Sequence, residues 1–179
     1  MSKKILITGG CRSGKSRHAL ELAGDVAGDK LYVATAEALD SEMADRIKKH
    51  QREREADWET HEESREVVAV FKQLENRKGV LILDCLTLWL SNLLGKNLGH
   101  EDILTETDRL MDQAERMQCR IIFVTNEVGA GIVPENKLAR DFRDLMGSVN
   151  QRVAQRCDTV FHMVSGIPMI LKNNGEPDD

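Results

Sequence analysis

The chain has 179 residues, which suits one domain with a sizeable core. Its net charge of −5 and the lack of a basic block argue against a protein that binds nucleic acid. No apolar run could span a bilayer and the N-terminus lacks a signal-peptide pattern, so we expect a cytoplasmic protein with reduced cysteines.

Short apolar runs alternate with helical patterns along the chain, which predicts an α/β fold. The runs are continuous, as in ILIT and VLILD, and this is typical of parallel strands buried on both faces. We therefore expect one domain over residues 1–172, with a mostly parallel sheet flanked by helices, and a polar tail over 173–179. In chain order the predicted elements are strand 4–8, helix 15–23, strand 30–35, helices 41–55 and 65–76, strand 80–84, helices 86–94 and 101–117, strand 120–125, helix 136–156 and strand 159–164.

The two longest predicted helices each carry one apolar face. Their apolar residues recur at helical spacing, as in a helix that packs on a sheet. The buried residues are expected to be Ile103, Thr107, Leu110, Met111, Ala114 and Met117 in the first helix, and Leu138, Phe142, Leu145, Val149 and Val153 in the second.

The segment GGCRSGKS follows the first predicted strand and fits the pattern GxxxxGK[ST] at every fixed position. Such a loop turns backbone N–H groups toward phosphate oxygens, and the helix after it offers its positive end. The alternative is a glycine-rich turn that binds nothing. The complete motif between a strand and a helix favours a P-loop NTPase-type fold, with Lys15 on the β- and γ-phosphates and Ser16 on Mg²⁺. The expected phosphate-binding residues are Gly9, Gly10, Cys11, Arg12, Ser13, Gly14, Lys15 and Ser16, with the Cys11 thiol as a small filler.

Asp84 ends the apolar strand VLILD, as the acidic residue of a Walker B strand does. In that role its carboxylate would hold Mg²⁺ directly or through water. The alternative is a turn residue that caps the helix expected from Leu86. Because the P-loop is complete, we favour the metal role.

His50 follows Met43 and Ile47 on one face of the predicted helix 41–55. A neutral imidazole is a competent nucleophile at phosphorus near pH 7. Spacing alone nevertheless favours an ordinary half-buried helix histidine.

Five segments, which cover most of residues 4–172, form a more specific pattern. They are TGGCRSGKSRHA, LYVATAEALDSEMADRIKKH, LILDCLTLWLSNLL, VTNEVGAGIVPENKLARDFRDLMGSVNQRVA and VSGIPMILK. In this order they resemble the bifunctional adenosylcobinamide kinase / adenosylcobinamide-phosphate guanylyltransferase family of cobalamin biosynthesis, and TNEVGAGIVP is the most specific part.

The resemblance implies two reactions at one nucleotide site. ATP or GTP, with Mg²⁺, phosphorylates adenosylcobinamide; GTP then guanylylates a histidine, which passes GMP to adenosylcobinamide phosphate. The histidine position after DSEMADRI is His50 here, so the resemblance favours a catalytic His50 beside Lys15. It also implies a homo-oligomer, often a trimer.

Further nucleotide contacts carry over by matching position. Glu62 is our candidate for the guanine edge, because a carboxylate accepts hydrogen bonds from two donors there. The residues implied beside the P-loop are Ala34, Thr35, Ala36, Gln51, Arg52, Glu53, Arg54, Glu62 and Asp84.

One position departs from the family pattern, and two other functions compete. The family commonly has proline after Arg54, whereas Glu55 stands here and lets the helix continue. A small-molecule P-loop kinase without guanylyl transfer would leave His50 and TNEVGAGIVP without a role. A GTP-binding switch would need mobile segments that the sequence does not mark.

Overall fold

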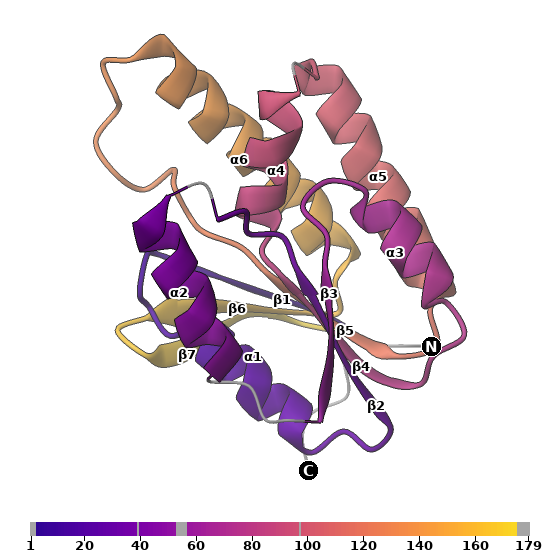
Figure 1. The fold of residues 1–179 in the computed structure, drawn as a ribbon. Helices are drawn as coiled ribbons and strands as arrows, with labels where there is room; N and C mark the ends of the chain where they lie inside the picture. Colours follow the sequence, from indigo (N-terminus) through magenta and orange to yellow (C-terminus); the bar gives the residue numbers. More distant parts are fainter. Residues whose placement is uncertain (1–2, 39, 53–56, 97, 175–179) are drawn as a thin grey trace.

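The computed structural model describes residues 3–38, 40–52, 57–96 and 98–174, without the side chains of residues 46, 49 and 50. A sheet of seven strands has the order β3-β2-β4-β5-β1-β6-β7 (Figure 1). All neighbouring strands are parallel except β6 and β7. The strands are β1 Lys4–Gly9, β2 Asp29–Ala34, β3 Trp58–Glu62, β4 Gly79–Asp84, β5 Arg120–Val124, β6 Thr159–Val164 and β7 Ile167–Asn173.

Helices cover both faces of the sheet, as expected for parallel strands. One face is covered by α3 to α6 and the opposite face by α1. None of the helices in the described ranges is long and apolar enough to cross a bilayer. The helices are α1 Lys15–Gly24, α2 Ser41–Arg52, α3 Val67–Gln73, α4 Leu86–Gly95, α5 His100–Arg116 and α6 Lys137–Arg156.

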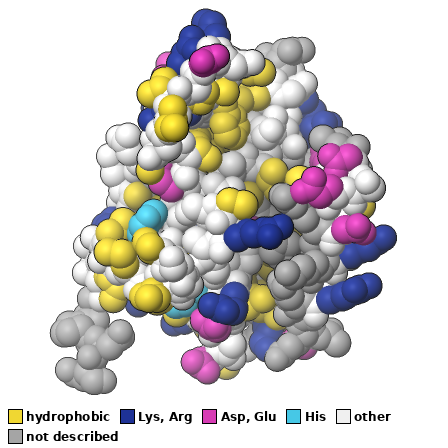
Figure 2. All heavy atoms as spheres, turned by 90° about the vertical axis from the view of Figure 1, so that its left-hand side faces the viewer, with side chains coloured by type: hydrophobic (Ala, Val, Ile, Leu, Met, Phe, Trp, Pro, Cys, Tyr) yellow, Lys and Arg dark blue, Asp and Glu magenta, His cyan; other side chains and the backbone are white. Residues whose placement is uncertain are grey.

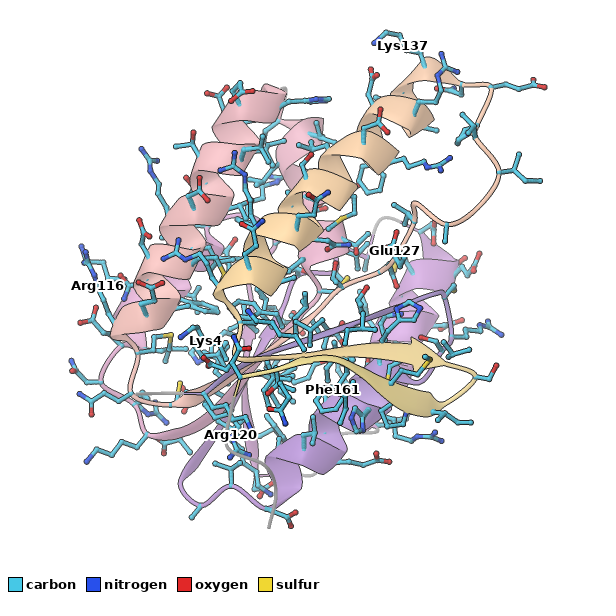
Figure 3. The ribbon with its side chains drawn as sticks, turned by 180° about the vertical axis from the view of Figure 1, so that it is seen from behind. Lys4, Arg116, Arg120, Glu127, Lys137 and Phe161 are labelled. Atoms are coloured by element: carbon cyan, nitrogen blue, oxygen red, sulfur yellow. The ribbon has the colours of Figure 1, made fainter. Side chains whose placement is uncertain are left out.

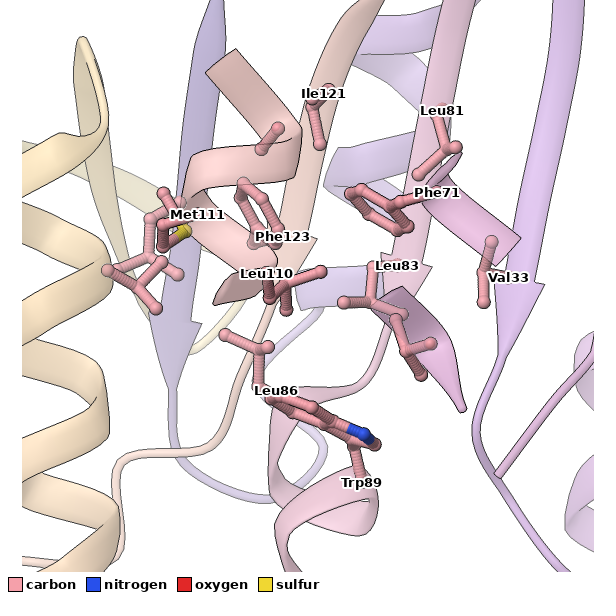
Figure 4. Packing of buried hydrophobic residues seen from close by; sticks show 14 of the residues in the cluster. Val33, Phe71, Leu81, Leu83, Leu86, Trp89, Leu110, Met111, Ile121 and Phe123 are labelled. Carbon is pink, nitrogen blue, oxygen red and sulfur yellow. The ribbon is translucent and has the colours of Figure 1, made fainter. Parts of the chain in front are cut away.

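The continuous apolar runs reflect burial on both faces of the central strands. In β4, Leu81 and Leu83 pack under α3 to α6, whereas Val80 and Ile82 face α1. Figure 4 shows the larger cluster, in which Trp89 is fully buried and packs near strand side chains. The predicted α/β class and mostly parallel sheet are confirmed.

Two strands were not predicted. The strand β3, WETHE, lies at one edge and, within the described ranges, pairs with β2 alone, so Glu59, Thr60 and Glu62 stay exposed. At the other edge, β7 has β6 as its one partner strand among the residues that the structure describes, and residues 167–171 are exposed. An edge strand with an exposed face does not need the apolar pattern by which buried strands are recognised.

Three further predictions need correction. Leu138 was expected on the buried face of the last helix, but its residue is 70% exposed. It lies in the first turn of α6, which projects beyond the sheet at the end of the long loop from β5 (Figure 1). The third helix, Val67–Gln73, is shorter than predicted at both ends. At its start, the Glu63 carboxylate accepts hydrogen bonds from the N–H groups of Arg65 and Glu66, so the helix begins after them. The polar tail was expected from Asn173, which instead ends β7; residues 175–179 lie outside the described part.

Candidate active site

The P-loop connects the end of β1 to the start of α1 at the carboxyl edge of the sheet. Gly9 has φ 151°, and a Cβ placed there would lie 2.6 Å from the Met163 carbonyl oxygen. Gly14 and Arg12 also have positive φ, at 95° and 54°. A backbone of this kind favours glycine and turns the loop tightly, as phosphate binding by N–H groups requires.

Lys15 is the first residue of α1 and is buried, with 8% of its surface exposed. Its Nζ donates a hydrogen bond to the Gly10 carbonyl oxygen at 2.6 Å, so the side chain folds back over the loop. Burial lowers the pKa of the Lys15 ammonium, although the nearby Cys85, Asp84 and Cys11 oppose the shift. An anionic phosphate in the loop would compensate this desolvated cation.

Ser16 and Asp84 meet next to Lys15. The Ser16 hydroxyl donates to Asp84 Oδ2 at 2.8 Å, and the Tyr32 hydroxyl donates to the same oxygen at 2.7 Å. A hydroxyl and a carboxylate are the hard oxygen ligands that Mg²⁺ takes beside substrate phosphates. No cluster of three His, Cys, Asp or Glu side chains in the described ranges could hold a metal by itself. The donor set therefore fits Mg²⁺ that arrives with a nucleotide.

The residues predicted after the second strand link β2 to β4. Thr35 is fully buried, and its hydroxyl accepts from the Cys85 N–H and donates to the Cys85 carbonyl, both at 2.8 Å. The Thr35 carbonyl accepts from Asn92 Nδ2 at 2.8 Å. Ala34 and Ala36, on either side, are half-buried. These hydrogen bonds hold the carboxyl ends of β2 and β4 together. They also use the Thr35 hydroxyl as both donor and acceptor within the protein.

A second group of predicted residues lies at the far edge of the sheet. Gln51 Nε2 donates to Glu62 Oε1 at 2.9 Å, which ties the end of α2 to the end of β3. Arg52 is exposed at the end of α2. The backbone of His50 belongs to α2, but its side chain, and all of Glu53, Arg54 and Glu55, lie outside the described part.

The hairpin of β6 and β7 supports the P-loop, which the sequence did not indicate. Ser165 and Gly166 form its turn with φ 51° and 85°. The Gly166 N–H donates to the Ser13 carbonyl at 3.0 Å. A Cβ at Gly14 would lie 3.3 Å from the Gly166 Cα. The Ser-Gly turn was visible in the sequence, but its contact with residues about 150 positions away was not.

The carboxyl end of β5 also reaches the P-loop. The Glu127 N–H donates to the Gly9 carbonyl at 3.0 Å. Figure 3 shows Glu127 where the long loop to α6 begins. The sequence marked TNEVGAGIVP as specific without giving it a role, and the structure places its first residues beside the P-loop.

Solved structures of similar fold, among them two ATPases, share low sequence identity with the chain. An ATPase of a bacterial type III secretion system superposes with a TM-score of 0.60 at 10% identity, over 90% of this chain and 51% of that one. The ATPase EscN from enteropathogenic E. coli gives 0.57 at 11% identity, over 91% and 42%. A Pyrococcus horikoshii OT3 protein gives 0.57 at 10% identity, over 97% and 88%. These similarities concern the fold alone.

Sequence relatives are much more similar. The chain is 43% identical to the bifunctional adenosylcobalamin biosynthesis protein CobU of Salmonella typhimurium strain LT2, over 94% of this chain and 99% of that protein. It is 42% identical to the protein CobP of Pseudomonas aeruginosa, which has the same description, over 96% and 98%. The profile of the family described as cobinamide kinase / cobinamide phosphate guanyltransferase matches residues 5–171. The chain therefore belongs to the cobinamide kinase / cobinamide phosphate guanyltransferase family.

Proposed function

We propose that the chain phosphorylates adenosylcobinamide with an NTP and then transfers GMP from GTP to adenosylcobinamide phosphate, which gives adenosylcobinamide-GDP. The observation that carries this proposal is the 43% identity, over 94% of the chain, to a protein named as bifunctional in adenosylcobalamin biosynthesis. The convergence of Lys15, Ser16 and Asp84 at one edge of the sheet supports it.

In the kinase reaction, the P-loop holds the NTP phosphates through backbone N–H groups and Lys15. The substrate hydroxyl oxygen forms a bond to the γ-phosphorus, the bond to the bridging oxygen breaks, and the NDP leaves. Ser16 and Asp84 would hold Mg²⁺, which when bound neutralises charge on the phosphate oxygens. The Lys15 ammonium also neutralises charge on these oxygens.

In the guanylyl transfer, His50 carries the GMP group. The neutral imidazole attacks the α-phosphorus of GTP, and pyrophosphate leaves. A phosphate oxygen of adenosylcobinamide phosphate then displaces the histidine, so the transfer occurs in two steps. Glu62 accepts from the guanine N1–H and amino group, and Gln51 at 2.9 Å helps to fix its orientation. The remaining contacts are proposed for the backbone around Ala34 and Ala36 and for residues 52–54.

The mass of the intact protein after incubation with GTP and Mg²⁺ tests the covalent step. We expect the wild type to gain one GMP residue, His50→Ala to gain none, and the exposed His100→Ala to gain one as the matched control. The label should be lost in acid and kept in base, as a phosphorus–nitrogen bond requires. GTP binding without any mass gain would leave a simple kinase or a GTP-binding switch as the better explanation.

We also propose a homo-oligomer, with three copies as the family resemblance implies. Exposed apolar side chains along β7 support an association surface: Ile167 is 66% and Ile170 is 62% exposed. Figure 2 shows hydrophobic side chains on the face where the β6–β7 hairpin lies. Light scattering on the wild type and on Ile170→Lys tests this, with a shift toward the monomer expected for the variant.

The cysteines bear on the location of the protein. Free thiols, among them the buried Cys85, Cys119 and Cys157, support a cytoplasmic location.

A further inference from the structure

The strand β5 lies between the P-loop strand β1 and the Asp84 strand β4. Its last residue, Val124, pairs with Ile7 on one side and with Asp84 on the other. Because neighbouring strands lie about 4.8 Å apart, the residues after Val124 emerge about one strand spacing from both. These residues therefore lie between the P-loop and Asp84, where the γ-phosphate would be bound in the proposed nucleotide complex.

Hydrogen bonds from two helices hold this end of β5 in place. The Thr125 hydroxyl donates to Asn150 Oδ1 at 2.8 Å, and Asn150 Nδ2 donates to the Asn126 carbonyl at 3.1 Å. The Asn126 N–H donates to the Thr87 hydroxyl at 2.8 Å. Thr87, Thr125 and Asn150 are all buried. The backbone before Glu127 is therefore fixed to both α4 and α6.

Glu127 presents a carboxylate at this fixed point. Its N–H is bonded to the Gly9 carbonyl, so it contacts the P-loop backbone directly. Its Oε1 accepts from the Gly129 N–H at 2.7 Å, which orients the side chain (Figure 3). A carboxylate has about four acceptor sites, so one such bond leaves room for a substrate hydroxyl. The side chain is half-buried and thus open to a ligand.

Other described carboxylates at this edge are less suitable as a base. Asp84 is bonded to Ser16 and Tyr32 and is assigned to Mg²⁺. Glu37 follows β2 and Glu62 ends β3, which are three and four strand positions from β1. At about 4.8 Å per strand, these positions are roughly 14 and 19 Å from the P-loop strand.

We propose that Glu127 is the general base of the kinase reaction, an inference that rests on the proposed function. The Glu127 carboxylate takes the proton of the cobinamide hydroxyl while the hydroxyl oxygen forms its bond to the γ-phosphorus. The bond between the γ-phosphorus and the bridging oxygen breaks, and the NDP leaves with that electron pair. The guanylyl transfer does not need this base, because a neutral imidazole attacks without losing a proton to a carboxylate.

The test compares both activities in Glu127→Gln, which keeps a side-chain oxygen for the Gly129 N–H but cannot take up a proton. We expect the kcat for cobinamide phosphorylation to fall by about 100- to 10,000-fold, the usual range for a lost general base. Labelling of His50 by GTP should proceed as in the wild type, which shows in the same preparation that the variant is folded and binds nucleotide. Glu135→Gln makes the same chemical change at an exposed position of the same loop and should leave both activities unchanged.

Each result decides between the alternatives. A Glu127→Gln enzyme with wild-type kinase kcat overturns the inference, and so does a variant in which kinase activity and labelling fall together. If the wild type itself transfers no phosphoryl group to cobinamide, the proposed function fails and the inference with it.

Discussion

A pair of glycine substitutions tests the P-loop geometry. In Gly9→Ala, the added Cβ would lie 2.6 Å from the Met163 carbonyl oxygen and 2.8 Å from the Ser13 hydroxyl oxygen, at a φ of 151°. In Gly10→Ala, the Cβ has no neighbour within 4 Å and the backbone φ is not positive. The two variants therefore add the same methyl group at adjacent positions, but only the one at Gly9 should meet a clash.

The clash at Gly9 sets the expected loss in the free energy of unfolding. Overpacking against a fixed backbone carbonyl costs about 1–3 kcal/mol, and an unfavourable backbone conformation adds about 1–3 kcal/mol. We expect Gly9→Ala to lose about 2–6 kcal/mol of the free energy of unfolding, out of a usual total of about 5–15. For a chain of this size, the melting temperature should fall by roughly 5–20 °C. Gly10→Ala should stay within about 1 kcal/mol of the wild type.

Urea unfolding and thermal unfolding of the nucleotide-free proteins measure the free energy of unfolding and the melting temperature. Comparable losses in the two variants would refute the reasoning, because they would mean that the methyl group acts through something other than the clash at Gly9. So would a Gly9→Ala protein as stable as the wild type.

Two further predictions concern the polar groups of the site. Tyr32→Phe removes a hydroxyl that donates to Asp84 at 2.7 Å, and since such bonds to charged groups contribute about 1.5–3 kcal/mol, the variant should melt several degrees lower; an unchanged melting curve would contradict this. Burial lowers the pKa of Lys15 in the folded protein from its ordinary value of 10.5. Between the lowered value and 10.5, the unfolded chain therefore binds more protons than the folded protein, and the stability of the nucleotide-free protein should rise as the pH rises through this window. Urea unfolding across the window should show this gain in the wild type and not in Lys15→Met, and parallel profiles would count against it.

The sequence predicted the central strands because their burial on both faces leaves a continuous apolar run, as in VLILD. It did not predict β3 or β7, since each lies at an edge of the described sheet and exposes much of its length. Pro168 in β7 is tolerated because an edge strand has backbone groups without a partner strand.

The local part of the site was predictable and the long-range part was not. The P-loop is one continuous segment whose glycines and Lys15 are recognisable from their spacing. Tyr32, Glu127 and Gly166 reach the loop or its partner Asp84 only through the strand order β2-β4-β5-β1-β6. No local pattern encodes that order, so their placement needed the structure.

The central position of β1 bears on how the protein is synthesised. Its two partner strands begin at Arg120 and Thr159, and the hairpin turn that bonds Ser13 is at Gly166. At about 5–20 residues per second, the ribosome needs roughly 8–30 s to add the residues between the P-loop and this turn. Until Arg120–Val124 has been synthesised, the apolar strand ILIT has no partner strand. A nascent chain released before Gly166 would contain the complete nucleotide motif without the hydrogen bond from the Gly166 N–H to the Ser13 carbonyl.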